Sequence, residues 1–170
     1  MNHHLKYCPK CGNTSLNWNN INKWSCDQCG FSLYNNVAGA VAVIIRWEDR
    51  LFFTQRNRDP QKGKLDLPGG FVDPNETAEE TCTRELFEEL QLEIDQKHLR
   101  YVGSRPNIYL YNQIEYRTLD LFYEYKVKED LKVEIEESEI QDYLWVSISE
   151  LNYDELAFES QKDFLKKYLI

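Results

Sequence analysis

The pattern of apolar and polar residues predicts several strands in the chain. The run VAGAVAVIIRW, which begins at Val37, is continuously apolar and β-branched, as is typical of a strand buried on both faces. The residues EDR then turn the chain into LFFTQR, which we expect to form a hairpin with the first run. Later, DYLWVSI predicts another strand, and YRTLDLFYEYKV alternates cleanly. It predicts a strand with Leu119, Leu121, Tyr123, Tyr125 and Val127 on one face.

Two further segments have the helical period. Thr77 is followed three residues later by Glu80, a capping-box pattern, so we expect a helix to begin near Thr77. Its inward side should hold Leu86, Phe87 and Leu90. The final segment, SQKDFLKKYLI, predicts an amphipathic helix whose inward residues are Phe164, Leu165, Tyr168 and Leu169. Residues 37–170 are therefore expected to form a mixed α/β (α+β) domain.

The first 36 residues have a different character, because they contain two pairs of cysteines. Cys8 and Cys11 form CPKC, Cys26 and Cys29 form CDQC, and a glycine follows each pair. Four thiolates at this spacing favour a tetrahedral Zn²⁺ site. Disulfides are the competing interpretation, but nothing in the sequence suggests secretion. Residues 1–36 are thus predicted to form a zinc ribbon.

The role of this zinc site has two interpretations. Four protein ligands leave no open position for a substrate, which favours a structural ion that helps a short segment to fold. The alternative is a nucleic-acid or partner module that presents Trp18, Trp24 and Phe31 as a stacking surface. Only three lysines accompany these aromatic residues, so we favour the structural role.

Charge and composition narrow the classes of function. The net charge of the chain is −9, which disfavours a general nucleic-acid binder. Residues 1–36 hold three lysines and one aspartate, a charge of +2, so the rest of the chain carries −11. No apolar run approaches the roughly 18 residues of a membrane span, and the first residues do not resemble a signal peptide. We expect a cytoplasmic protein that recruits cations if it binds phosphates.

The negative charge is concentrated behind a Pro-Gly-Gly turn, where six glutamates lie between Glu76 and Glu89. Glu85, Glu88 and Glu89 share one helical face that contains no lysine. A solvated acidic face is the simpler interpretation. However, Gly69 and Gly70 permit close approach of a ligand to the backbone, and several carboxylates suit Mg²⁺ or Mn²⁺. We therefore predict a divalent-cation site.

This segment resembles the signature of the Nudix hydrolase family, G-x5-E-x7-R-E-U-x-E-E-x-G-U, where U is an apolar residue. Gly70, Glu76 and the run Arg84-Glu85-Leu86-Phe87-Glu88-Glu89 match at the required spacing, and Leu92 fills the last position. Gln91 replaces the second glycine, at a position where we expect left-handed backbone and a cost of about 1 kcal/mol. The resemblance implies an α/β/α sandwich with a mixed sheet, preceded by the zinc ribbon.

The resemblance also implies roles for individual residues. Glu85, Glu88, Glu89 and the carbonyl of Gly70 would bind Mg²⁺ or Mn²⁺, and Glu76 would pair with Arg84. The reaction would be hydrolysis of the pyrophosphate bond of a nucleoside diphosphate linked to another group. A carboxylate must accept the proton of the attacking water. Besides Glu85, the later loop offers Glu136, Glu137 and Glu139, of which we favour Glu139.

Substrate-binding residues are less clearly specified by the sequence. Arg56 and Arg58 are candidates for substrate phosphates, or else belong to a solvated loop. Tyr109 is a candidate for stacking on a base or sugar, together with Tyr111 and Tyr116, unless these residues pack in the core. Cys82 is expected to be a small buried residue and not a nucleophile.

A zinc ribbon before a Nudix domain is similar to NADH pyrophosphatases. Their downstream S-Q-P-W array reads SRPN here: Ser104 and Pro106 match, Arg105 replaces the glutamine, and the tryptophan is missing. NAD(H), ADP-ribose, a nucleotide sugar and a modified nucleoside triphosphate all remain candidate small-molecule substrates.

Two other classes of function stay open at this point. The first is a catalytically weak Nudix domain that senses a nucleotide ligand, for which Gln91 is the only support. The second is a zinc-ribbon module that binds nucleic acid or a partner and uses the Nudix domain as a scaffold. A homodimer is compatible with either segment, although no residue specifies it.

Overall fold

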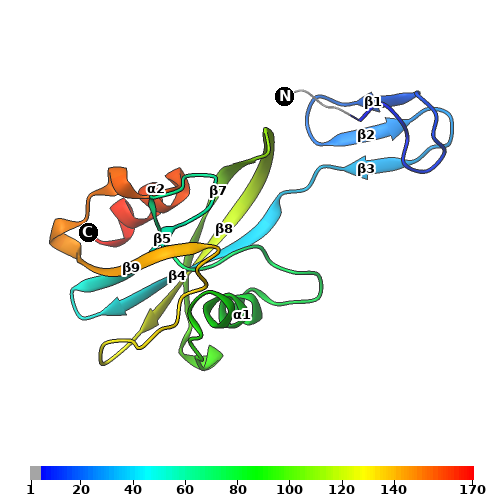
Figure 1. Ribbon diagram of the computed structural model, residues 1–170. Coiled ribbons are helices and arrows are strands. Elements are labelled where there is room, and N and C mark those ends of the chain that lie inside the picture. Colours follow the sequence, from blue (N-terminus) through cyan, green and yellow to red (C-terminus); the bar gives the residue numbers. More distant parts are fainter. Residues whose placement is uncertain (1–4) are drawn as a thin grey trace. The chain divides into compact units, whose positions relative to one another are not determined.

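The computed structural model describes residues 5–170, which divide into two compact units at Val37 (Figure 1). The first unit is a small antiparallel sheet of three strands in the order β1-β2-β3: β1 (Leu16–Trp18), β2 (Lys23–Cys26) and β3 (Ser32–Tyr34). Trp24 is buried and its ring lies 4.3 Å from that of Trp18, so it is not an open stacking platform. Among the described residues, no helix is both long enough and apolar enough to span a membrane.

The second unit is built on a mixed six-stranded sheet, which confirms the predicted fold class. Its strands are β4 (Ala38–Trp47), β5 (Arg50–Arg56), β6 (Leu65–Asp66), β7 (Arg100–Tyr111), β8 (Ile114–Lys126) and β9 (Ile140–Ser147). The order is β6-β5-β4-β8-β7, and β9 also pairs with β5. Strand β4 runs parallel to β8 along its length but pairs with β5 only near the turn, at Arg46–Leu51 and Trp47–Arg50. The sheet therefore opens between β4 and β5.

Helices cover both faces of this sheet. Helix α1 (Ala78–Leu90) and helix α2 (Glu159–Tyr168) belong to separate core clusters, and short 3-10 helices lie at Gln96–His98, Ile148–Glu150 and Tyr153–Glu155. Strand β4 supplies both clusters alternately: Ala42 and Ile44 pack on the α2 side, whereas Val41 and Val43 pack on the α1 side. The prediction of a strand buried on both faces is thus confirmed.

Helix α1 begins where the sequence predicts, but its inward face is displaced from the predicted one. Thr77 is the N-cap and forms a complete capping box with Glu80. The buried positions are Thr81, Cys82, Leu86 and Leu90, whereas Phe87 is 45% exposed. The prediction for Phe87 is wrong because the apolar stripe continues from Leu86 back to Cys82 and not across to the next residue.

Strand β8 confirms the predicted strand, although its first apolar residue is not buried. Leu119 is 38% exposed, although Leu121, Tyr123 and Tyr125 do pack on the α1 side. The opposite face is buried as well, and its buried members are Thr118, Asp120, Phe122 and Glu124. The reason is that α2 covers this face. Phe164 of α2 stacks on Phe122 with ring centroids 4.1 Å apart. The predicted inward residues of α2 are confirmed.

Candidate functional site

Arg84 joins the acidic face of α1 to the chain that precedes it. Its Nε and Nη2 donate to the two carboxylate oxygens of Glu76 at 2.9 and 3.1 Å, and its Nη1 donates to Glu85 at 2.8 Å and Glu88 at 2.9 Å. Nη2 also donates to the carbonyl of Phe71. The hydrogen bonds from Arg84, followed by those from Thr81 and Asp73, lower the pKa of Glu76 to about 2. Glu76 is therefore a permanent carboxylate that fixes the loop against the helix.

The segment Pro68–Gly70 passes between β4 and α1 with little room to spare. A Cβ on Gly69, where φ is +148°, would collide with the carbonyl of Val41, and one on Gly70 would collide with the carboxylate of Glu85. The carbonyls of Pro68 and Gly70 accept hydrogen bonds from Val43 and Val41 at 2.9 and 2.8 Å. The oxygen expected to face a cation, that of Gly70, is therefore directed at β4 instead.

Gly69 lies between these two residues, and its N–H points to α1 and not to β4. Its N–H donates to Oε2 of Glu89 at 3.2 Å. Among residues 5–170, no backbone N–H donates to its carbonyl oxygen. The carbonyl of Gly69 is therefore available to a ligand, whereas the sequence motif pointed to that of Gly70.

A loop before β9 is tied to the end of α1 and brings Glu139 to the same place. The N–H groups of Glu134 and Glu136 donate to the carbonyls of Leu90 and Glu89 at 3.0 and 2.9 Å, which satisfies the open end of the helix. Glu139 forms an ion pair with Arg58. Glu136 and Glu139 both contribute to the lining described next, whereas Glu137 does not.

These elements surround a depression that we call the acidic depression. Its lining comprises Arg58, Gly69, Gly70, Phe71, Asp73, Arg84, Glu85, Glu88, Glu89, Glu136 and Glu139. Burial raises the pKa of Glu85, and burial followed by the charges of Asp66 and Glu85 raises the pKa of Glu89 well above its usual range. Crowded carboxylates of this kind bind hard divalent cations, which relieve their mutual repulsion.

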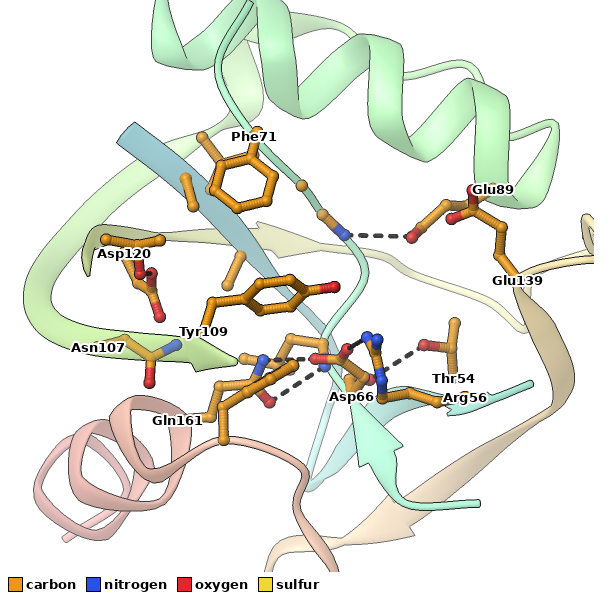
Figure 2. A pocket seen from close by; sticks show the side chains of 18 of the residues that line it. Thr54, Arg56, Asp66, Phe71, Glu89, Asn107, Tyr109, Asp120, Glu139 and Gln161 are labelled. Atoms are coloured by element: carbon orange, nitrogen blue, oxygen red, sulfur yellow. Dashed lines mark hydrogen bonds and ion pairs between the residues drawn. The ribbon is translucent and has the colours of Figure 1, made fainter. Parts of the chain in front are cut away.

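A second hollow, the aromatic pocket, adjoins the acidic depression and shares Arg58, Gly69, Gly70, Phe71, Glu89 and Glu139 with it. Figure 2 shows the rings of Phe71 and Tyr109 between the Glu89–Glu139 end and the Asp120–Asn107 end. These two rings meet edge to face, with centroids 5.6 Å apart. Phe158, whose ring lies 5.7 Å from Tyr109, continues the aromatic wall.

The floor of the aromatic pocket consists of small and polar residues on one face of three paired strands. Ala40 of β4 is in register with Asp120 of β8, and Asn107 of β7 is in register with Thr118. Side chains two residues apart point to the same face, so Ala40 and Ala42 leave the space into which the polar residues project. Further along the same face, Phe122 and Ile44 fill the space and form the core.

Arg56 lies in this pocket and is held by several groups at once. It forms an ion pair with Asp66 at 2.5 Å, donates from Nε to the carbonyl of Pro60 at 2.7 Å, and lies 5.1 Å from the centre of the Phe158 ring. Gln161 donates to the other oxygen of Asp66. The remaining nitrogen of Arg56, Nη2, is buried without a hydrogen-bond partner.

The structure thus brings most of the predicted site residues to one region and separates a few. Glu85, Glu88, Glu89, Glu139, Arg58 and Arg56 line the two adjoining hollows together with Tyr109. Tyr111 and Tyr116 do not line them, and Cys82 is fully buried, as predicted. Asp66, Phe71, Asp120, Phe158 and Gln161 were missed. Of these five residues, only Phe71 could have been found from the sequence, because it directly follows the Pro-Gly-Gly turn.

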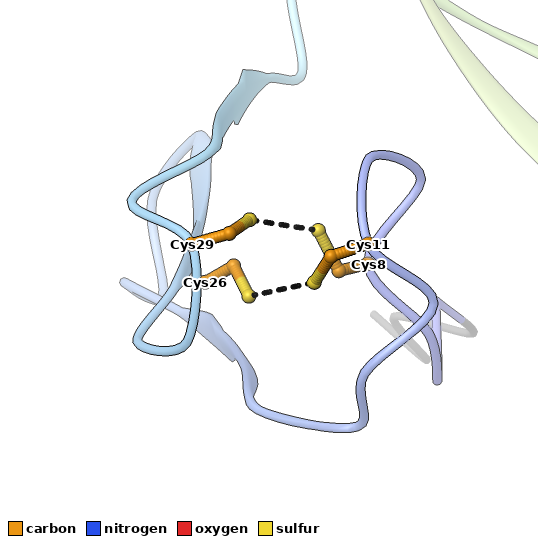
Figure 3. Close-up of side chains that lie close together, drawn as sticks. All are labelled: Cys8, Cys11, Cys26 and Cys29. Carbon is orange, nitrogen blue, oxygen red and sulfur yellow. Dashed lines mark hydrogen bonds between the residues drawn. The ribbon is translucent and has the colours of Figure 1, made fainter.

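The four cysteines form a separate cluster in the first unit (Figure 3). Their sulfur atoms lie within 4.8 Å of one another, and the Cys8–Cys29 and Cys11–Cys26 pairs are 3.7 Å apart. A tetrahedron with Zn–S bonds of about 2.3 Å has edges of about 3.8 Å, so the spacing suits zinc. Gly12 and Gly30, at φ of +72° and +68°, donate to the carbonyls of Cys8 and Cys26 and close two matching turns.

Comparisons with known proteins agree with this geometry. Residues 36–168 match the NUDIX domain family. The chain is 30% identical over 152 residues to the NAD-capped RNA hydrolase NudC of Haemophilus influenzae (strain PittGG), an alignment that covers 86% of this chain and 54% of that protein. The chain therefore spans about half the length of the curated relatives it matches.

Solved structures show the same fold. A NUDIX hydrolase from Nitrosomonas europaea superposes with a TM-score of 0.68 at 24% identity, covering 97% of this chain and 90% of that chain. A bifunctional NMN adenylyltransferase/ADP ribose pyrophosphatase from Francisella tularensis, complexed with AMP and a manganese ion, gives 0.61 at 21% identity, covering 80% of this chain and 42% of that chain. The chain belongs to the NUDIX domain family.

Proposed function

We propose that this protein hydrolyses the pyrophosphate bond of a nucleoside diphosphate linked to another group, in the manner of NAD or ADP-ribose, with the help of a divalent cation. The observation that carries this proposal is the junction of the acidic depression with the aromatic pocket. The carboxylates suit a cation, the pocket suits a planar ring, and Gly69, Gly70 and Arg58 lie where a pyrophosphate would connect them.

The cation would be held by Glu85, Glu88 and Glu89 together with the carbonyl of Gly69. Mg²⁺ and Mn²⁺ both favour oxygen ligands, and Mg²⁺ usually keeps several waters and binds substrate phosphates. Such an ion supplies charge neutralisation and a coordinated water of lowered pKa. Arg84 already contacts Glu85 and Glu88 and would orient their carboxylates.

The proton of the attacking water needs an acceptor, and two residues meet the requirements. Glu85 is largely buried, and burial raises its pKa, which strengthens it as a base. Glu139 faces the depression from the opposite side and is held by Arg58. Glu136 is a poorer base, because hydrogen bonds from Ser138 lower its pKa.

Cationic side chains would position the phosphates. Arg58 is about half exposed and shares the junction of the two hollows, so it can leave Glu139 and contact a phosphate. Arg56 is fixed more firmly, but its free Nη2 offers one further donor. Tyr109 and Phe71 would pack against the ring of the substrate. Relatives named as NAD-capped RNA hydrolases support an NAD-type dinucleotide as the substrate class.

The cysteine cluster completes the proposal. Residues 1–36 would form a ribbon stabilised by one Zn²⁺ on Cys8, Cys11, Cys26 and Cys29, and residues 37–170 would form the hydrolase domain. Four sulfur ligands leave no open coordination position, so the ion would be structural.

The test is product release from NAD, NADH, ADP-ribose, nucleotide sugars and nucleoside triphosphates with Mg²⁺ or Mn²⁺. The proposal expects cation-dependent cleavage of at least one dinucleotide, and a loss of about 10²–10³-fold in Glu88→Gln, equivalent to about 3–4 kcal/mol. Glu93→Gln is the matched control, since Glu93 is exposed and outside both hollows. Silence of the wild type across the panel, with Mn²⁺ bound, would refute the proposal.

A further inference from the structure

The end of the aromatic pocket furthest from the helix carboxylates contains a buried acid that the hydrolytic reaction does not use. Asp120 is only 8% exposed. Thr118 donates its hydroxyl to Oδ1 and Ser160 donates its hydroxyl to Oδ2, both at 2.6 Å. Both oxygens of Asp120 thus act as hydrogen-bond acceptors.

This carboxylate has unused capacity as an acceptor. Each carboxylate oxygen can accept two hydrogen bonds, and each oxygen of Asp120 receives one. Within residues 5–170, no lysine or arginine forms an ion pair with Asp120. Arg105 is in register with Asp120 on β7, but its guanidinium lies over the Phe164 ring and donates to the carbonyl of Ser104. The free acceptor positions of Asp120 therefore favour a ligand that brings hydrogen-bond donors.

The surroundings fix the shape of that ligand. Asp120 lies beyond the rings of Phe71 and Tyr109 when the pocket is followed from Glu89, and Asn107 lies beside it (Figure 2). Ala40, in register with Asp120, leaves space above the floor of the sheet. A flat ring whose diphosphate occupies the junction would therefore direct its outer edge at Asp120.

We propose that Asp120 selects substrates whose planar ring carries an NH₂ group. The donor is either the exocyclic amine of adenine or the carboxamide of nicotinamide, and both have the same hydrogen-bonding chemistry. A keto oxygen or a carboxylate at the same position would face the negative charge of Asp120 and leave its lone pairs unsatisfied. This inference rests on the proposed function, since it concerns the substrate of that same site.

The test compares NAD with two analogues that each replace one NH₂ group: nicotinic acid adenine dinucleotide and nicotinamide hypoxanthine dinucleotide. We expect wild-type kcat/KM to fall about 10- to 100-fold for one of them, as is usual when a buried polar group loses its partner. The analogue whose kcat/KM falls identifies the ring that faces Asp120. In Asp120→Asn the preference should fall below about threefold. Asp163→Asn, on the exposed face of α2, should retain it.

Different failures have different meanings. Equal cleavage of all three compounds by the wild type would overturn this inference and leave the proposed hydrolysis intact. Equal loss of preference in Asp163→Asn would also overturn it. If none of the compounds is cleaved, the proposed function fails. The inference is then decided by the binding constants of NAD and the two analogues, measured by ligand quenching of protein fluorescence. The preference of the wild type for NAD over each analogue is measured without a variant. It therefore tests the inference even if Asp120→Asn does not fold.

Discussion

A methyl group at Gly70 would displace the carboxylate on which the proposed reaction depends. An ideal Cβ at this position lies 2.5 Å from Cδ and 2.7 Å from Oε2 of Glu85, whereas ordinary van der Waals contact begins at 3.4 Å. The carboxylate of Glu85 must therefore move by about 1 Å, a displacement that costs a catalytic group about 10²-fold in rate. Gly70 does not have a positive φ, so alanine brings no backbone strain.

The assay for Gly70→Ala is steady-state cleavage of the preferred dinucleotide with Mg²⁺, accompanied by thermal unfolding. We expect kcat to fall about 10²-fold while the melting temperature stays close to that of the wild type. Gly39→Ala is the matched control, because its Cβ would meet only Val72, at 3.2 Å, away from both hollows. If Gly70→Ala retained kcat within about threefold, the position of the Glu85 carboxylate would not matter as reasoned.

Three further predictions concern stability and metal content. Gln91→Gly should raise the free energy of unfolding by about 1 kcal/mol, measured by urea titration, because Gln91 has φ of +50° at the end of α1; a loss of stability would contradict this. Burial opposes the ionisation of Glu124, but hydrogen bonds from Tyr168 and Arg100 outweigh it and lower the pKa of this carboxyl. The stabilisation that Glu124 contributes is therefore present above the unfolded pKa of about 4.3 and is lost as pH falls through the lowered folded-state pKa. Glu124→Gln should therefore lose about 2 kcal/mol at pH 7 and much less near pH 3, and a deficit independent of pH would refute the assignment. Cys26→Ser should lose bound zinc in elemental analysis and unfold the first unit, while an unchanged zinc content would argue against the four-sulfur site.

Much of the architecture could be predicted because local patterns were strong. The capping box of Thr77 and Glu80 set the start of α1, and the long apolar run of β4 indicated burial on both faces. Burial was harder to predict where tertiary partners decide it. Phe87 is exposed because Cys82 occupies the inward stripe, and Thr118 and Asp120 are buried because α2 covers a face of β8 that reads as polar.

Only the acidic part of the candidate site could be predicted from the sequence. The glutamates of α1 have fixed spacing in the sequence, so their shared face follows from helix geometry. The aromatic pocket does not follow, because its walls come from distant segments: Phe71, Tyr109 and Phe158 meet only through the folded sheet. The carbonyl of Gly69 was missed because its availability depends on the hydrogen bonds that β4 makes with Pro68 and Gly70.

In the proposed reaction, water attacks phosphorus at the junction of the acidic depression and the aromatic pocket. The most direct test is cleavage of NAD in ¹⁸O-labelled water with Mg²⁺, followed by mass spectrometry of the products. Hydrolysis of the pyrophosphate bond predicts AMP and nicotinamide mononucleotide, with the label in the phosphate of one of them, and no product in Glu88→Gln. Label recovered on a ribose carbon, or products formed equally by Glu88→Gln, would contradict the proposed reaction.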